Sequence, residues 1–140
     1  MNNIWDDRYK GFTLIELLAT IVVIGILSII AIASFSTFGA KGKRTDGINA
    51  ILAVSLAEER YRSNNSQYGT LAQVYGGVST SPQGYYSLSV SATSATAYTI
   101  TATAQGTQTR DTEGSTSCTP LRMTVSSGTV TKTPAVCWPS

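Results

Sequence analysis

The feature that most constrains this chain is an uninterrupted apolar run near its N-terminus. Residues 17–40 carry no charged side chain, and residues 12–38 would place apolar side chains on every side of a helix. A helix needs only about 20 mostly apolar residues to cross the hydrocarbon core of a bilayer. We therefore predict a membrane-spanning helix joined to a water-exposed body, residues 41–140, which holds eight Lys or Arg and five Asp or Glu.

One acidic residue, Glu16, lies at the start of this apolar run. On insertion scales a carboxylate costs about 2.5–3.5 kcal/mol at the centre of a membrane helix, and less near an interface. One interpretation is that the side chain extends to the membrane surface. The other is that Glu16 is there to meet a buried partner of opposite charge.

Two processing routes are open for the N-terminal segment. In a secretory signal, residues 17–30 would be the apolar core and Ala31-Ile32-Ala33 the cleavage site, so the mature chain would begin at Ser34. Such signals begin with a positively charged region. Here the charged residues of that region cancel; they are Asp6, Asp7, Arg8 and Lys10.

Residues 10–16 read K-G-F-T-L-I-E and lead directly into the apolar run. This pattern resembles the class III signal of type IV pilins and their pseudopilin relatives. The resemblance implies that prepilin peptidase removes residues 1–11 by cutting after Gly11, and that the new terminal Phe12 is N-methylated. It also implies that Glu16 acts in filament assembly. A terminal amine has an ordinary pKa of about 7.7–8.0, so the Phe12 amine of a neighbouring subunit could pair with Glu16 as a cation.

In this family the apolar helix stays in the mature protein, so residues 12–38 would form the transmembrane and filament-core helix. Residues 39–64 would continue it as an amphipathic half. We expect Ile48, Ile51, Leu52 and Leu56 to share the face that packs on the rest of the protein.

Glycines and polar residues interrupt the second half of the helix. Gly39, Gly42 and Gly47 each weaken a helix by about 1 kcal/mol relative to alanine, which predicts bending or local melting between 39 and 47. Many pilins also carry a helix-kinking proline where this chain has Ala33. Polar residues 63–66 are expected to end the helix.

Residues 65–140 are expected to form a globular head. The neutral stretch that follows residue 66 has the composition of a surface loop. Apolar and polar residues then alternate over 85–90, 98–103 and 121–125, and a turn at 126–128 leads to a fourth strand at 129–133. The predicted fold is α+β, with the long helix packed on a four-stranded antiparallel sheet, and the pilin resemblance implies the same fold.

Two cysteines, Cys118 and Cys137, flank the last predicted hairpin. With a membrane segment upstream, a disulfide is the simplest interpretation, although two separate buried thiols are the alternative. A disulfide would place the head outside the cytoplasm. The pair also resembles the C-terminal disulfide loop of type IV pilins, and the ending T-K-T-P-A-V-C-W is similar to PilE-like minor pilins.

Enzymatic function has little support in the sequence. The chain has no histidine, which excludes histidine-dependent catalysis, and we expect neither catalytic residues nor a cofactor. Asp111 and Glu113 could bind a cation, as in some pseudopilins, or could lie in a solvated loop; we expect no metal site. The resemblance implies a structural subunit, major or minor, of a type IV pilus.

Such a subunit would be stored in the inner membrane, with its head in the periplasm, and taken up by the pilus assembly machinery into an extracellular filament of pilin subunits. Pili of this kind serve in adhesion, twitching motility and DNA uptake. Two alternatives are a pseudopilin of a type II secretion system and a minor pilin that receives DNA. For the latter, a basic aromatic strip could be formed by Arg110, Arg122, Lys132, Tyr85, Tyr86 and Tyr98, unless these are separate surface and core positions.

Overall fold

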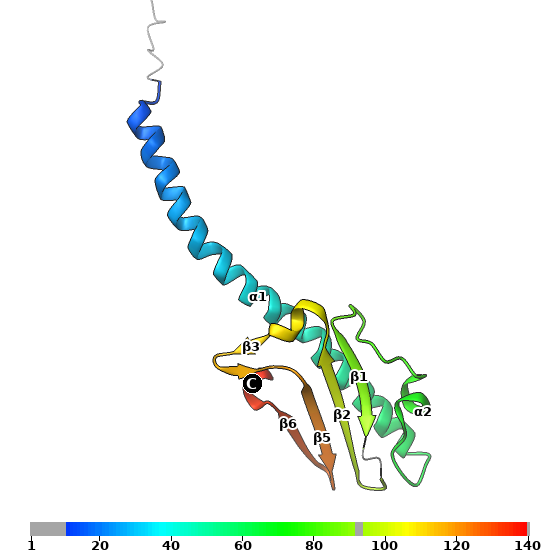
Figure 1. The fold of residues 1–140 in the computed structure, drawn as a ribbon. Coiled ribbons are helices and arrows are strands. Elements are labelled where there is room, and N and C mark those ends of the chain that lie inside the picture. Colours follow the sequence, from blue (N-terminus) through cyan, green and yellow to red (C-terminus); the bar gives the residue numbers. More distant parts are fainter. Residues whose placement is uncertain (1–10, 92–93, 140) are drawn as a thin grey trace, which may run out of the picture. The chain divides into compact units, whose positions relative to one another are not determined.

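The computed structural model describes residues 11–91 and 94–139. They fall into two compact units, one ending at Ser36 and the other beginning at Thr37. Helix α1 (Leu14–Arg62) begins in the first unit and ends in the second (Figure 1). The remaining elements are α2 (Leu71–Tyr75), β1 (Tyr86–Ser91), β2 (Ala97–Ala104), η1 (Gly106–Arg110), β3 (Thr112–Glu113), β4 (Thr116–Ser117), β5 (Leu121–Ser126), β6 (Thr129–Thr133) and η2 (Ala135–Cys137).

The first unit is an apolar stretch of α1. Its window Leu14–Ala31 has a mean hydropathy of 2.7, and none of this window is buried within the chain. Large apolar side chains of this window are exposed; Ile29, for example, is 74% exposed. Length and composition therefore suit a membrane span, because lipid or other apolar helices would cover this surface.

The second unit is built on a four-stranded antiparallel sheet in the order β1-β2-β5-β6. Tyr86 pairs with Ala104 between β1 and β2, and Ile100 pairs with Met123 between β2 and β5. The hairpin of β5 and β6 turns through Ser127 and Gly128, which both have a positive φ. The predicted four strands and their antiparallel arrangement are confirmed.

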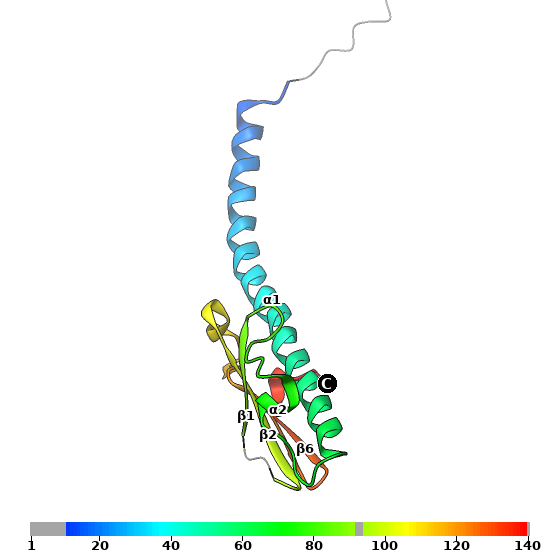
Figure 2. The same cartoon turned by 90° about the vertical axis from the view of Figure 1, so that its right-hand side faces the viewer.

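Alternation along the strands decides which side chains enter the core. One face of the sheet packs on the C-terminal half of α1, and Figure 2 shows helix and sheet as two adjacent layers. Helix positions Ile48, Ile51 and Val54 are buried there. The strands contribute Tyr86, Leu88, Tyr98, Ile100, Ala102, Ala104, Leu121, Met123 and Val125.

The predicted packing face of the helix is partly wrong. Leu52 and Leu56 are 46% and 54% exposed, whereas Val54 and the acidic Glu58 are fully buried. The buried row therefore follows positions 48, 51, 54 and 58. An acidic residue in that row interrupts the apolar stripe, so the sequence pattern pointed to the neighbouring row that carries two leucines.

The glycines at 39–47 do not break the helix, since α1 is continuous through them. Gly47 has a packing role: a Cβ atom there would lie 2.8 Å from the ring of Tyr86. Gly39 and Gly42 have no atom within 4 Å of such a Cβ position. The structure thus requires glycine at 47 for a close approach of helix and strand.

The helix ends at Arg62, immediately before the polar residues expected to end it. The following segment was expected to be a plain surface loop, but it contains the short helix α2. The side chain of Gln73 accepts a hydrogen bond from the Thr70 backbone N–H at 2.8 Å. The T-x-x-Q pattern of residues 70–73 is a capping signal that can be read from the sequence.

Candidate functional site

The expected processing site lies at the first described residues. Residues 1–10 of the expected leader lie outside the described part of the chain, whereas Gly11 is exposed and Phe12 is 83% exposed. The Thr13 hydroxyl accepts a hydrogen bond from the Glu16 backbone N–H at 3.3 Å, which caps the start of α1. Glu16 is exposed and lies in the first turn of the helix.

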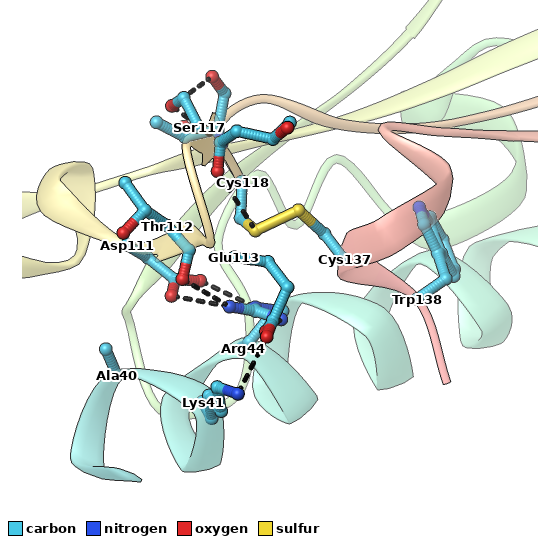
Figure 3. The surroundings of a disulfide bond; sticks show 12 residues. Ala40, Lys41, Arg44, Asp111, Thr112, Glu113, Ser117, Cys118, Cys137 and Trp138 are labelled. Carbon is cyan, nitrogen blue, oxygen red and sulfur yellow. Dashed lines mark hydrogen bonds and ion pairs between the residues drawn. A yellow bond between two sulfur atoms is a disulfide. The ribbon is translucent and has the colours of Figure 1, made fainter. Parts of the chain in front are cut away.

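A cluster of charges, buried at its centre, connects α1 to the loop before the first cysteine (Figure 3). We name it the Arg44 cluster; its members are Lys41, Arg44, Asp111 and Glu113. The Arg44 guanidinium donates to both Asp111 carboxylate oxygens, from Nε and Nη2, at 2.7 Å each. Its Nη1 donates to Glu113 at 3.0 Å, and Lys41 Nζ donates to the other Glu113 oxygen at 2.8 Å.

The Arg44 cluster corrects the interpretation of Asp111 as a residue of a solvated loop. Asp111 is 2% exposed, so it does not belong to a solvated loop. The hydrogen bonds of both carboxylates go to Lys41 and Arg44, and the described residues contain no group of three or more metal-ligating side chains. The cluster is a structural ion-pair network. The hydrogen bond from Lys41 has the largest effect on the pKa of the Glu113 carboxyl, and it lowers that pKa; the hydrogen bond from Arg44 lowers it further.

The predicted disulfide is present. Cys118 and Cys137 are joined with an S–S length of 2.00 Å, and both residues are buried. The backbone N–H of Cys118 donates to the Asp111 carbonyl at 2.9 Å, so the disulfide and the Arg44 cluster hold the same loop. Near Cys137, the Lys132 ammonium lies over the Trp138 ring, with 5.3 Å from Nζ to the ring centre.

Replacing Cys118 by serine should make the head sensitive to protease while the membrane helix still inserts. A disulfide that closes a loop of this size, 19 residues in separation, contributes about 3 kcal/mol in the chain-entropy model. The rate of limited proteolysis of the full chain in detergent measures this loss. Cys137→Ser should match Cys118→Ser, and labelling of both thiols in the native protein would contradict the account.

Glu58 is a buried acidic residue near the C-terminal end of α1. Its Oε2 accepts a hydrogen bond from the Gly69 backbone N–H at 2.9 Å, and its fully buried Oε1 has no hydrogen-bond partner among the described residues. Burial raises the pKa of this carboxyl, the Gly69 N–H opposes the rise, and the nearby Glu59 adds to it. Folding therefore makes the Glu58 carboxyl harder to deprotonate than it is in the unfolded chain.

Glu58→Gln should stabilise the head at pH 8 and make little difference at pH 4. A raised folded-state pKa gives stability that is complete below the unfolded value of about 4.3 and is lost as pH rises through the folded value. Thermal unfolding of both proteins across this range measures the difference. Glu113→Gln provides a control of opposite sign: its pKa is lowered, so the variant should lose stability at neutral pH and approach wild type in acid.

The basic aromatic strip that was considered for DNA binding does not form as a whole. Tyr86 and Tyr98 are fully buried, because they occupy inward positions of β1 and β2, so neither ring can stack on a base. The Tyr98 hydroxyl lies 2.9 Å from Ser55 Oγ, and burial raises the pKa of Tyr98 to about 12. Tyr85 is half-buried, and the exposed cations among the predicted residues are Arg110, Arg122 and Lys132.

The elements define the class of protein. A long apolar N-terminal helix continues into a head in which helix and four-stranded antiparallel sheet pack together, and a C-terminal disulfide closes the last segment. This is the α+β arrangement of a type IV pilin, and the cysteine pair fits a PilE-like minor pilin.

Comparison with protein families agrees with this class. A model described as "Prokaryotic N-terminal methylation motif" matches residues 6–32. A second, described as "Type IV minor pilin ComP, DNA uptake sequence receptor", matches residues 33–122. The second covers more than half of the chain, so the protein belongs to the ComP family of type IV minor pilins. No match was found among curated proteins.

The protein is therefore a subunit of a type IV pilus, and the pilin families to which it is matched are structural rather than enzymatic. Membership in these families implies assembly with other pilins and processing by prepilin peptidase. The N-terminal motif and the apolar helix fit a membrane-anchored prepilin that later enters the pilus.

Proposed function

We propose that the chain is made as a prepilin, is cut between Gly11 and Phe12, and is N-methylated at Phe12. The observation that carries this proposal is the methylation-motif match over residues 6–32, which spans the proposed cut and ends where the pilin match begins. The cut bond lies in the segment without regular secondary structure before α1, and Gly11 is exposed. An exposed backbone outside a helix suits entry into a peptidase site.

Replacing Gly11 by leucine tests the processing step. We expect the variant to remain at prepilin mass, because the side chain would obstruct the backbone that the peptidase must bind. Immunoblotting of cell envelopes measures the two forms, and Gly39→Leu is a matched control outside the site. Normal maturation of Gly11→Leu would refute the proposed cut.

After processing, the apolar helix would hold the subunit in the inner membrane with the head in the periplasm. The disulfide supports this orientation, because stable disulfides form outside the reducing cytoplasm. In the filament, the same apolar surface would contact the helices of other subunits. Exposed Leu52 and Leu56 extend the apolar side chains of α1 into the head and would add to that contact.

Glu16 would then set the register of each incoming subunit. Among the described residues of this single chain, no cation lies within ion-pair distance of its carboxylate, and cleavage would create a cationic amine at Phe12 of a neighbour. A buried pair of this kind fixes relative position even where it adds little net stability.

DNA binding is a second proposed function, and the matched family description supports it by naming a DNA uptake sequence receptor. Arg110 and Arg122 are exposed and would contact phosphates, whereas Lys132 pairs with the inward-facing Met123 and so lies on the other face of the sheet from Arg122. Arg122 lies on the outward face of the sheet, where the neighbouring Thr101 and Thr133 could donate hydroxyl hydrogen bonds. These few cations predict modest affinity that weakens as salt rises.

Fluorescence anisotropy with duplex DNA tests the second function on the processed full chain in neutral detergent. Two phosphate contacts predict a slope of about −2 in log affinity against log salt, and Arg122→Gln should reduce its magnitude by about 1. Arg60→Gln, on the helix away from the sheet face, is the control. Absence of binding at 50 mM salt would contradict a role as DNA receptor and leave the pilus function intact.

A further inference from the structure

An exposed aromatic residue and two lysines lie close together along α1 where the chain enters the second unit, and one of the lysines contacts a tyrosine. Phe38 is 75% exposed, and the next charged residues along the helix are Lys41 and Lys43. The Lys43 ammonium lies 5.0 Å from the ring centre of Tyr85, just before β1. We name Phe38, Lys41, Lys43 and Tyr85 the interfacial cluster.

The position of the interfacial cluster follows from the length of the uncharged run. The 24 residues from 17 to 40 correspond to about 36 Å of helix at 1.5 Å per residue. A bilayer has about 30 Å of hydrocarbon and about 40–45 Å including its headgroup regions. If the run crosses the bilayer, Lys41 and Lys43 reach the depth of the headgroups.

The side chains of the cluster have the chemistry of a membrane interface. The Lys43 ammonium lies over the face of the Tyr85 ring in a cation–π contact, and tyrosine combines an apolar ring with a polar hydroxyl. Lys41 is already paired with Glu113, yet its side chain is 44% exposed. For Lys43 the described residues provide no carboxylate within ion-pair distance, which leaves its charge available to an anion.

We propose that the interfacial cluster binds the headgroups of anionic phospholipids while the subunit is stored in the membrane. This inference rests on the proposed membrane storage. Lys43 supplies the attraction to the lipid phosphate, Tyr85 orients the ammonium, and Phe38 enters the edge of the acyl region. The contact holds the head at the membrane surface and is released when the subunit enters the filament.

Electron spin resonance of spin-labelled lipids tests the proposal on the processed full chain in phosphatidylcholine vesicles. The measured quantity is the association of labelled phosphatidylglycerol relative to labelled phosphatidylcholine. We expect wild type to prefer phosphatidylglycerol, and Lys43→Gln to lower that preference by up to about fivefold. Lys43→Arg should keep the preference, and Lys132→Gln, which alters an exposed lysine over Trp138, is the matched control.

Equal association of the two lipids with wild type would overturn the proposal, as would equal effects of Lys43→Gln and Lys132→Gln. If Lys43→Gln weakened duplex DNA binding without changing lipid preference, the lysine would belong to a DNA contact instead, and the proposal would be wrong. Failure of the wild-type chain to stay in vesicles after alkaline carbonate washing would contradict membrane storage itself, a result distinct from insertion without lipid preference.

Discussion

Arg44→Met is expected to destabilise the head by about 3–5 kcal/mol, a loss typical of breaking one side of a buried ion pair. The Arg44 and Asp111 side chains are only 7% and 1% exposed. Without the guanidinium, the Asp111 carboxylate would remain buried with no cation on it. For a head of about 100 residues this corresponds to a melting temperature lower by roughly 12 °C or more.

Two further variants separate charge from packing. Arg44→Lys keeps the charge but cannot donate to both Asp111 oxygens in a fork, so its stability should lie between wild type and Arg44→Met. Arg44→Met combined with Asp111→Leu removes both charges and should be more stable than Arg44→Met alone. Thermal unfolding measures all three. An Arg44→Met head as stable as wild type would contradict a structural role for the cluster.

Glu16→Ala is expected to deplete the subunit from filaments while leaving it in the membrane. Removing the carboxylate relieves an insertion cost of up to about 2.5–3.5 kcal/mol, so the monomer should insert at least as well as wild type. In the filament the Phe12 amine of a neighbour would lose its partner in an apolar core, at a cost of about 3–5 kcal/mol. This corresponds to incorporation lower by more than about a hundredfold.

Co-expression of wild type and Glu16→Ala in one strain measures the effect, because both compete for the same filaments. The ratio in sheared pili is compared with the ratio in the inner membrane. Glu16→Asp should be intermediate, since its side chain is one methylene shorter. Equal incorporation of Glu16→Ala would contradict the pairing role. It would favour the other interpretation, in which the Glu16 side chain only extends to the membrane surface.

The sequence predicts the parts of this fold that depend on local patterns. Alternation over 85–90, 98–103 and 121–125 predicts three of the four strands, because successive side chains of a strand point to opposite faces. The charge-free run likewise identified the apolar helix. The C-terminal disulfide followed from there being two cysteines in the chain.

Long-range charge pairing is the part that the sequence does not reveal. Arg44 and Asp111 are 67 residues apart, and nothing near either residue marks the other as its partner. Asp111 therefore had the pattern of a solvated loop residue. The prediction of the buried helix face was partly wrong for a related reason. Glu58 lies in the buried row, where its carboxylate accepts a hydrogen bond from the backbone N–H of Gly69, 11 positions further along the chain.

The most direct test of the central claim is the N-terminus of the protein isolated from sheared pili. Intact mass and N-terminal sequencing should give a chain that begins at N-methyl-Phe12, retains the apolar helix and is two hydrogens lighter than the reduced form. A chain that begins at Ser34 would show secretion by a conventional signal peptide, and would contradict a pilus subunit held by its N-terminal helix.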